Sequence, residues 1–179
     1  MEQYQSRVTV MQWDGESVAR LMDGASVFVA VMEKQPSDKG EYISFYVHDD
    51  GEFYICDQKA GDIVGVREAW RKEGDTYIFQ ADGAAGPFKP AYQLHAEHIR
   101  HWIELKEVYA KRLKKLSMAE IRGYGYKSKD EFIEGWKRKM KYLARTYKAK
   151  GIPYKWEDNP WVWVYKYKRT EKPEKTRWY

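Results

Sequence analysis

The chain has 179 residues, about the size of one average domain, with 43% hydrophobic and 16% aromatic residues. This composition predicts a folded core and excludes a disordered chain. No stretch reaches the ~18 uncharged apolar residues that a membrane helix needs, and the first residues, MEQYQSRVTV, lack the pattern of a secretory signal. One cysteine, Cys56, excludes an internal disulfide framework and a Cys-based zinc site. We therefore expect a protein of the reducing cytoplasm.

The formal net charge of +5 is distributed unevenly along the chain. Residues 1–99 carry 9 Lys and Arg against 17 Asp and Glu, a net charge of −8. Residues 100–179 carry 23 Lys and Arg against 10 Asp and Glu, a net charge of +13. A basic half of this size is typical of a protein with a polyanionic partner. It is also compatible with a solvated surface that pairs with the acidic half, so both interpretations stay open.

The chain begins with a strand and a short helix. Residues 7–12 predict the strand, and residues 13–24 predict the helix, with Asp14 or Ser17 as its N-cap and Gly24 as its stop. The inward-facing residues of this helix are expected to be Val18, Leu21 and Met22.

The next segments are rich in Val, Ile, Phe and Tyr, as β-strands are. The expected strands are 26–34, 41–48, 52–56, the buried end of 60–70, and 75–81. Asp49-Asp50-Gly51 joins the second and third of these, and the last pairs with the strand before it across Lys72-Glu73-Gly74. A Gly/Pro-rich loop follows at 81–90.

Two long strands are expected in the second half. The first covers 99–113 and has a bulge near Lys106 and Glu107, where the apolar positions change phase. The second covers 160–168, and its alternation places four aromatic residues on one face, namely Trp161, Trp163, Tyr165 and Tyr167. The other face is expected to be solvated, and it carries Val162, Val164, Lys166 and Lys168. Residues 170–179 are expected to fray.

Two capping boxes predict helices between these strands. Ser117 with Glu120 opens a short helix, and Ser128 with Glu131 opens a long helix over 129–150. The long helix has an apolar stripe at spacings of four, four, three and four, formed by Phe132, Trp136, Met140, Leu143 and Tyr147. Seven or eight strands with few helices predict an α+β fold built on a closed or nearly closed barrel.

Four segments resemble the ASCH domain, in the form found in bacteriophage and prophage proteins. They are AGDIVGVREAW, IRHWIELKEVYAKRLKKLSMAEIRGYGY, KDEFIEGW and WEDNPWVWVYKYKR. The resemblance covers residues 60–169 well and residues 1–59 poorly. It implies a single PUA-like domain over 1–169, in which a short N-terminal helix and a long basic C-terminal helix flank a β-barrel. It also implies a nucleic-acid or modified-nucleoside cleft beside that barrel.

The resemblance implies a catalytic set that this chain has only in part. Enzymatic ASCH proteins, which are similar to small acetylcytidine amidohydrolases, combine the Glu of a Val-Arg-Glu segment with a Lys and a Thr after the first helix. Glu68 matches the Glu, but DGASVFVAVMEK has no Lys or Thr at that spacing. A carboxylate without these partners cannot perform the family's base-assisted step, so we expect no catalysis by that route. Glu68 is then either a cleft carboxylate or a structural carboxylate paired with an arginine or a backbone amide.

Candidate nucleic-acid-binding residues lie in two places. Arg67, Trp70 and Arg71 flank Glu68 and would line the implied cleft. The long helix has a basic face, which runs from Lys137 to Lys150 and includes Lys139. Its candidate phosphate contacts are Lys137, Arg138, Lys141, Arg145 and Lys148. For this helix, an ordinary solvated face, a membrane surface and a partner's groove are the alternatives.

Some aromatic residues and histidines are also candidates for a functional role rather than a structural one. Trp13, Trp70 and Tyr92 are candidates for stacking on a base, although packing in a core is the ordinary role of such residues. His95, His98 and His101 lie close together in the sequence, but a loop that runs into a strand directs them differently, so we favour structural or surface histidines over a metal site. The sequence predicts no cofactor and no metal.

Three functions are compared. The preferred one is a phage-encoded, ASCH-like protein that binds nucleic acid, either RNA or single-stranded segments, without the family's chemistry. The second is a phage counter-defence inhibitor of the anti-CRISPR type, which binds a host nuclease or ribonucleoprotein effector. The third is an ASCH-type amidohydrolase or ribonuclease that uses Glu68. The sequence predicts neither the ligand nor the oligomeric state.

Overall fold

The computed structural model describes residues 7–32, 35–36, 41–43, 46–49, 52–146 and 154–174. The chain divides into two compact units. Unit 1 consists of Met1–Gly24, Ala60–Lys106 and Tyr167–Tyr179, and unit 2 consists of Ala25–Lys59 and Glu107–Lys166. Each unit is therefore assembled from segments that are far apart in the sequence. No helix in the described ranges is long and apolar enough to cross a membrane.

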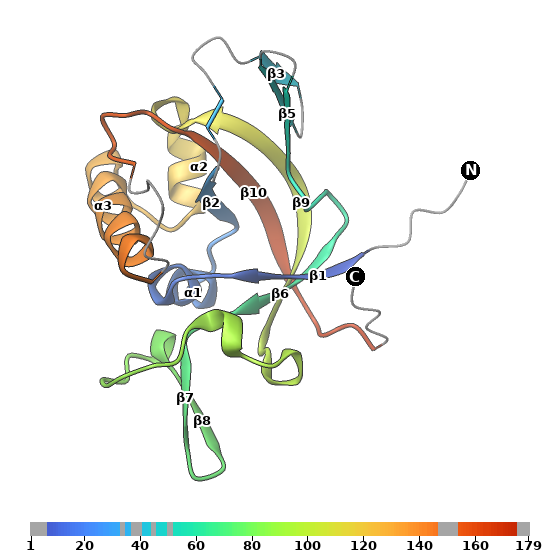
Figure 1. Ribbon diagram of the computed structural model, residues 1–179, viewed down its shortest axis with the longest axis vertical. Helices are drawn as coiled ribbons and strands as arrows, with labels where there is room; N and C mark the ends of the chain where they lie inside the picture. The colour runs from blue at the N-terminus through green and yellow to red at the C-terminus, as the bar shows by residue number, and fades with distance from the viewer. Residues whose placement is uncertain are drawn as a thin grey trace. The chain divides into compact units, whose positions relative to one another are not determined.

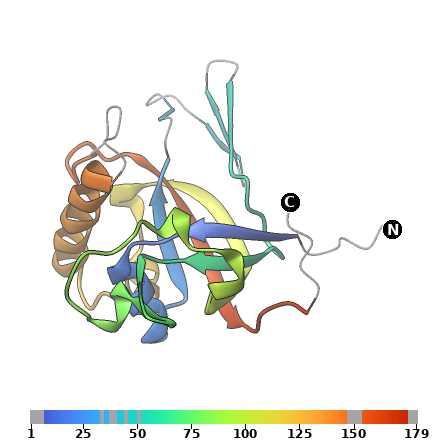
Figure 2. The same cartoon turned by 60° about the horizontal axis from the view of Figure 1, so that its bottom comes forward.

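Five strands form one mixed sheet in the order β1-β6-β9-β10-β2 (Figure 1). In unit 1, β1 (Val8–Gln12) pairs in parallel with β6 (Ile63–Arg67), and the two lie side by side in Figure 2. β9 (His101–Arg112) pairs with β6 in antiparallel orientation. In unit 2, β10 (Trp161–Thr170) pairs in antiparallel orientation with β2 (Val27–Val31). β9 and β10 each contribute residues to both units.

Unit 1 adds a helix and a hairpin to its strands. α1 (Gly15–Met22) begins at Asp14, whose carboxylate accepts hydrogen bonds from the amide and hydroxyl groups of Ser17, as expected for an N-cap. The hairpin consists of β7 (Trp70–Glu73) and β8 (Thr76–Phe79). Three short 3-10 helices follow it, η1 (Gln80–Asp82), η2 (Ala91–Gln93) and η3 (Ala96–His98). A core cluster of this unit consists of Val8, Trp70, Phe79, Leu94, Ile99 and Trp102.

Unit 2 contains the two helices that the capping boxes predict. These are α2 (Met118–Gly123) and α3 (Lys129–Thr146), and a 3-10 turn, η4 (Leu113–Lys115), precedes them. At α2 both bonds of the box between Ser117 and Glu120 are formed. At α3 the hydroxyl of Ser128 accepts from the amide of Glu131, but the Glu131 carboxylate accepts from the amide of Lys127 rather than of Ser128.

The apolar stripe of α3 is buried where the sequence places it. Phe132, Trp136 and Met140 are each at most 3% exposed, and Leu143 is half-buried. Tyr147, the last predicted member, lies outside the described residues. A separate three-stranded sheet in unit 2 has the order β3 (Glu41–Ile43), β4 (Tyr46–Asp49), β5 (Glu52–Ile55).

The prediction of an α+β protein is confirmed, but the prediction of a closed or nearly closed barrel is wrong. Within the described residues the five-stranded sheet is open, and β1 and β2 are its edge strands. Strand counting misled the prediction because β3, β4 and β5 pair with one another and β7 pairs with β8, so half of the strands do not join the main sheet.

Two pairings in the first half also differ from the prediction. The segment 41–48 forms two paired strands, with Ile43 opposite Tyr46. Ser44 is a turn-forming residue type, but β-prone residues flank it on both sides in EYISFYVH, so the sequence there has only a weak turn signal. The segment 75–81 pairs with β7 rather than β6 because the chain leaves the main sheet at Glu68 and Ala69.

Burial differs from the prediction at two places. Met22 is 39% exposed because it lies about 100° around α1 from the buried Leu21. Val162 and Val164 of β10 are fully buried, so both faces of the first part of this strand are covered. The change of phase expected in β9 is found where the sequence places it, since two adjacent residues, Lys106 and Glu107, are both exposed.

Candidate functional site

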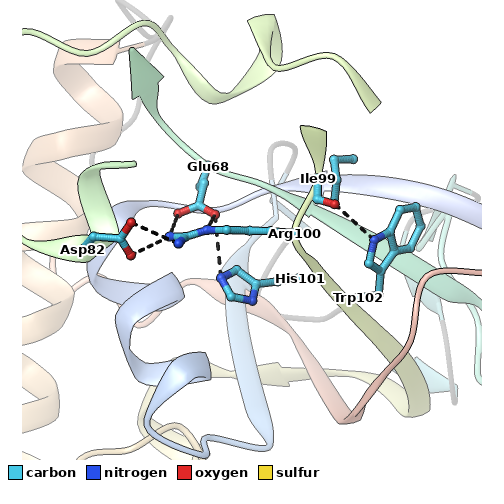
Figure 3. A network of polar contacts seen from close by, with 6 residues as sticks. All are labelled: Glu68, Asp82, Ile99, Arg100, His101 and Trp102. Carbon is cyan, nitrogen blue, oxygen red and sulfur yellow. Dashed lines mark hydrogen bonds and ion pairs between the residues drawn. The ribbon is translucent and has the colours of Figure 1, made fainter. Parts of the chain in front are cut away.

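Glu68 follows β6 directly, and its side chain is fully buried in unit 1. Arg100, directly before β9, binds it with two hydrogen bonds (Figure 3). Its Nε donates to Oε1 at 2.7 Å, and its Nη2 donates to Oε2 at 2.9 Å. The two residues meet because β6 and β9 are antiparallel neighbours, so the end of one lies beside the start of the other. One guanidinium thus occupies both oxygens of Glu68.

Asp82, at the end of η1, holds the other edge of the same guanidinium. Its carboxylate accepts from Nη1 of Arg100 at 3.0 Å and from Nη2 at 2.8 Å. The ring of Phe79 faces the guanidinium, with 4.2 Å between its centroid and Cζ of Arg100. Arg100 is therefore fixed by two carboxylates and one aromatic ring.

The charges of this cluster influence one another. Burial raises the pKa of Glu68, and the hydrogen bonds from Arg100 oppose this effect only in part. The negative charge of Asp82 raises the pKa of Glu68 further. Burial lowers the pKa of Arg100, but its hydrogen bonds to both carboxylates outweigh burial, so this pKa is raised overall. With both acids ionised, two negative charges share one positive charge.

His101, the first residue of β9, is buried beside the cluster and is 8% exposed. Its Nε2 lies 3.8 Å from Oε1 of Glu68 (Figure 3), and neither ring nitrogen has a hydrogen-bond partner among the residues that the structure describes. Burial and the positive charges of Arg100 and Arg169 lower the pKa of His101 to about 4. The imidazole is therefore neutral at neutral pH and forms no ion pair with Glu68.

Of the two interpretations of Glu68, the geometry corresponds to the paired structural carboxylate. A general base needs an oxygen that reaches the substrate, and both oxygens of Glu68 already accept hydrogen bonds from Arg100. Sequence reasoning missed Arg100 and Asp82. Glu68 and Arg100 are 32 residues apart in the sequence, and the only local signal is a charged residue beside a strand in each of GVRE and IRHW.

The aromatic candidates differ in their exposure. Trp70 is 6% exposed and contacts Tyr77, with ring centroids 5.2 Å apart, and Lys89, whose Nζ lies 4.8 Å from the ring centroid. Trp13 is 2% exposed. Neither tryptophan presents an open ring face on which a base could stack, whereas Tyr92 is 50% exposed.

The two arginines predicted near Glu68 differ in their contacts. Arg67 is half-buried on β6, and its buried Nε has no hydrogen-bond partner within the described part of the chain. Arg71 donates from Nε to Glu73 at 2.9 Å and from Nη1 to the carbonyl oxygen of Ala85. Its guanidinium also lies over the ring of Phe88, 5.1 Å from the centroid. Arg71 thereby attaches the Gly/Pro-rich loop to the β7–β8 hairpin.

The basic candidates of α3 lie on the surface of unit 2. The side chains of Lys137, Arg138, Lys141 and Arg145 are all exposed. Nζ of Lys137 donates to Glu134 at 2.6 Å, a surface ion pair within the helix. Lys148 lies outside the described residues. These four described residues remain candidates for contact with phosphates.

Lys139 does not belong to this basic face, contrary to the expectation. Its Nζ donates to the carbonyl oxygen of Val29 in β2 at 2.7 Å and to the hydroxyl of Tyr124 at 2.9 Å. It also lies 4.0 Å from the ring centroid of Phe28. Its spacing could have revealed this position, because Lys139 follows the buried Trp136 by three residues and therefore shares its side of the helix. Lys139 attaches α3 to the edge strand β2.

The three clustered histidines have different surroundings. His98 accepts or donates a hydrogen bond with the hydroxyl of Tyr77 at 2.8 Å, and the two rings stack with centroids 4.0 Å apart. His95 is exposed, and His101 is buried beside Glu68. In the ranges that the structure describes, no group of three or more His, Cys, Asp or Glu residues could hold a metal ion.

The fold and the site together define an α+β protein with an open mixed sheet, a cluster of one arginine and two carboxylates of which Glu68 is buried, and a basic helix face. No family model, curated protein or solved structure matches the chain. The resemblance to the ASCH domain therefore rests on the four sequence segments alone.

Proposed function

We propose that the chain is an ASCH-like protein that binds nucleic acid, RNA or single-stranded segments, and that the exposed basic face of α3 contacts the phosphates. The resemblance of residues 60–169 to phage-type ASCH proteins supports a nucleic-acid ligand. The net charge of +13 on residues 100–179 supports a polyanionic one. The single observation that carries the proposal is the clustering of exposed cations on one face of α3.

The four described cations of this face, Lys137, Arg138, Lys141 and Arg145, form a continuous ridge. At 3.6 residues per turn they fall within about 100° of arc, and they extend over about 12 Å of helix. Within α3, Glu134 pairs with Lys137, and no Asp or Glu follows Glu134 in the helix.

Contacts on the other faces of α3 hold the helix in place. Phe132 and Trp136 are 1% exposed, and Nε1 of Trp136 donates to the carbonyl oxygen of Tyr154 at 3.0 Å. Lys139 adds the hydrogen bond to β2 described above. A helix that is fixed in this way presents its cations without ordering them at the moment of binding, which lowers the entropic cost of association.

The proposal is tested with a triple variant, Arg138→Gln, Lys141→Gln and Arg145→Gln, and a short single-stranded RNA followed by fluorescence polarisation at several salt concentrations. Each phosphate contact on a single strand contributes about 0.7 to the slope of log affinity against log salt. The triple variant is therefore expected to bind more weakly and to have a salt slope that is smaller by about 2.

A matched control changes the same amount of charge elsewhere in unit 2, by Lys115→Gln, Lys127→Gln and Lys155→Gln at three exposed positions. The control is expected to keep most of the wild-type slope. A wild-type affinity that does not change with salt would refute the proposal. Equal losses in the two triple variants would also refute it, since they would indicate an effect of net charge rather than of this face.

A further inference from the structure

The guanidinium of Arg100 has two edges that can each bind an oxyanion, and both are occupied in unit 1. The edge formed by Nε and Nη2 binds Glu68, and the edge formed by Nη1 and Nη2 binds Asp82. The two carboxylates have very different surroundings, because the side chain of Glu68 is 0% exposed and that of Asp82 is 41% exposed. One edge therefore faces the core, and the other faces the surface.

The inner contacts are sufficient to orient Arg100 without Asp82. Glu68 holds Nε and Nη2 at 2.7 and 2.9 Å, and Phe79 holds the plane of the guanidinium at 4.2 Å. The planar fork of arginine is rigid, so fixing one edge also fixes the direction of the other. If Asp82 moved away, the outer edge would still point to the same place.

Asp82 is the less firmly held partner. It lies on a short surface element, η1, and the next residue, Gly83, has a φ of 81°, a conformation that glycine adopts readily. Its carboxylate is also exposed to water, which weakens an ion pair relative to a buried one. The charge of Asp82 also raises the pKa of Glu68, so its presence is electrostatically unfavourable for the buried carboxylate. A competing oxyanion from solution would replace Asp82 without exposing Glu68.

We propose that the outer edge of Arg100 is a phosphate-binding position, which the carboxylate of Asp82 occupies in the unliganded protein and yields to a phosphate of the ligand. Arginine binds phosphate with two parallel hydrogen bonds, the geometry in which Asp82 is bound here. In assigning the phosphate to a nucleic acid, this inference rests on the proposed function. Asp82 then acts as an internal competitor that weakens binding at Arg100.

The test compares two variants of the full chain, Asp82→Asn and the control Asp75→Asn. Asp75 is an exposed residue in the turn of the β7–β8 hairpin, and it forms an ion pair with Lys72 at 3.6 Å, so the control removes the same charge from another surface pair. Each protein is titrated with inorganic phosphate and, separately, with the short single-stranded RNA. Binding at the site is followed through the NMR resonance of the Arg100 Nε–H group.

Asp82→Asn is expected to bind phosphate about two- to fivefold more tightly than the control, the factor that an exposed ion pair is worth. The Arg100 resonance is expected to shift at correspondingly lower concentrations. Adding Arg100→Lys to Asp82→Asn is expected to abolish the gain, because lysine cannot bind with two parallel bonds. A gain with RNA that exceeds the gain with inorganic phosphate would assign the position to nucleic acid, and the reverse would assign it to a free phosphate.

The inference and the proposed function fail in different ways. The phosphate position is refuted if Asp82→Asn and Asp75→Asn bind both ligands equally and the Arg100 resonance does not move. In that case, loss of RNA binding in the α3 triple variant would still support the proposed function. If the wild type does not bind RNA but Asp82→Asn gains affinity for inorganic phosphate, the position stands and the proposed function falls.

Discussion

Glu68 and Arg100 form an ion pair in which both oxygens of the buried Glu68 carboxylate accept hydrogen bonds from one guanidinium. Arg100→Gln leaves a buried carboxylate without its cation, and we expect the free energy of unfolding at neutral pH to fall by about 3–5 kcal/mol. Glu68→Gln removes the charge but keeps one acceptor, so we expect a smaller loss of about 1–3 kcal/mol. Urea denaturation measures both.

The double variant provides the control for this pair. Because Glu68→Gln and Arg100→Gln remove the two halves of one interaction, their combination is expected to cost less than the sum of the single losses. If Arg100→Gln unfolds with the wild-type free energy, the pair does not stabilise unit 1 in the way its geometry indicates.

His101 makes the stability of the protein depend on pH. The pKa of His101 is about 4 in the folded protein, and its ordinary value, which applies to the unfolded chain, is 6.5. Between these two pH values the unfolded chain therefore binds a proton that the folded protein does not. Lowering the pH through this window therefore favours unfolding, by about 3 kcal/mol in total for this residue. Glu68 acts in the opposite direction, because its raised pKa lets the folded protein bind a proton more readily.

The contribution of His101 is isolated by comparing the wild type with His101→Gln, since Glu68 is present in both. Urea denaturation at a series of pH values is expected to show a weaker loss of stability on acidification in the variant. His95→Gln removes an exposed histidine, leaves His101 in place and is expected to keep the wild-type dependence. If the free energy of unfolding changes equally with pH in the wild type and in His101→Gln, His101 does not cause the loss of stability on acidification.

Replacing either of two nearby lysines of α3 by methionine is expected to affect stability and RNA binding in opposite ways. Lys139→Met removes the donor to Val29 and Tyr124, and we expect the free energy of unfolding to fall by about 1–3 kcal/mol with the salt slope of RNA binding unchanged. Lys141→Met changes an exposed residue, so we expect stability to change by less than about 0.5 kcal/mol and the slope to fall. Both assignments would be wrong if Lys139→Met lowered the salt slope and Lys141→Met lowered the free energy of unfolding.

Gly135 is a case in which the usual effect of alanine on a helix is expected to reverse. Replacing glycine by alanine inside a helix ordinarily stabilises it by about 1 kcal/mol. Here a Cβ at Gly135 would lie 2.2 Å from the hydroxyl oxygen of Tyr126 and 2.4 Å from its Cε1. We expect Gly135→Ala to lower the thermal midpoint through this overlap. Glu134→Ala, at the adjacent exposed position, is expected to leave it nearly unchanged.

Local patterns predicted the elements whose cause is local. The capping box at Ser117, the N-cap at Asp14 and the buried stripe of α3 all depend on residues within one or two turns of one another, and the structure confirms them. The closed barrel failed because strand pairing is a property of the whole chain. Lys72-Glu73-Gly74 indicated a hairpin, but nothing in the local sequence indicates that its first strand, β7, is separate from β6, or that β6 pairs with β9.

In the candidate site, too, the sequence predicted the local features but not the contacts between distant residues. The sequence singled out Glu68, but its partners Arg100 and Asp82 come from a strand and a 3-10 helix that only the fold brings together. The basic face of α3 was visible because charges on one helix face follow from spacing alone. Lys139 was misplaced on that face because its aliphatic stem and ammonium suit a carbonyl lined by aromatic rings as well as they suit water.

β10, the last strand in the described ranges, contributes Trp161–Lys166 to unit 2 and its following residues to unit 1. A ribosome that has made the first 160 residues has therefore completed neither unit. Neither unit can be produced as one continuous fragment of the chain, because each contains strand residues from separate segments. Both halves of the protein must wait for the same late-synthesised segment before they can reach their final structure.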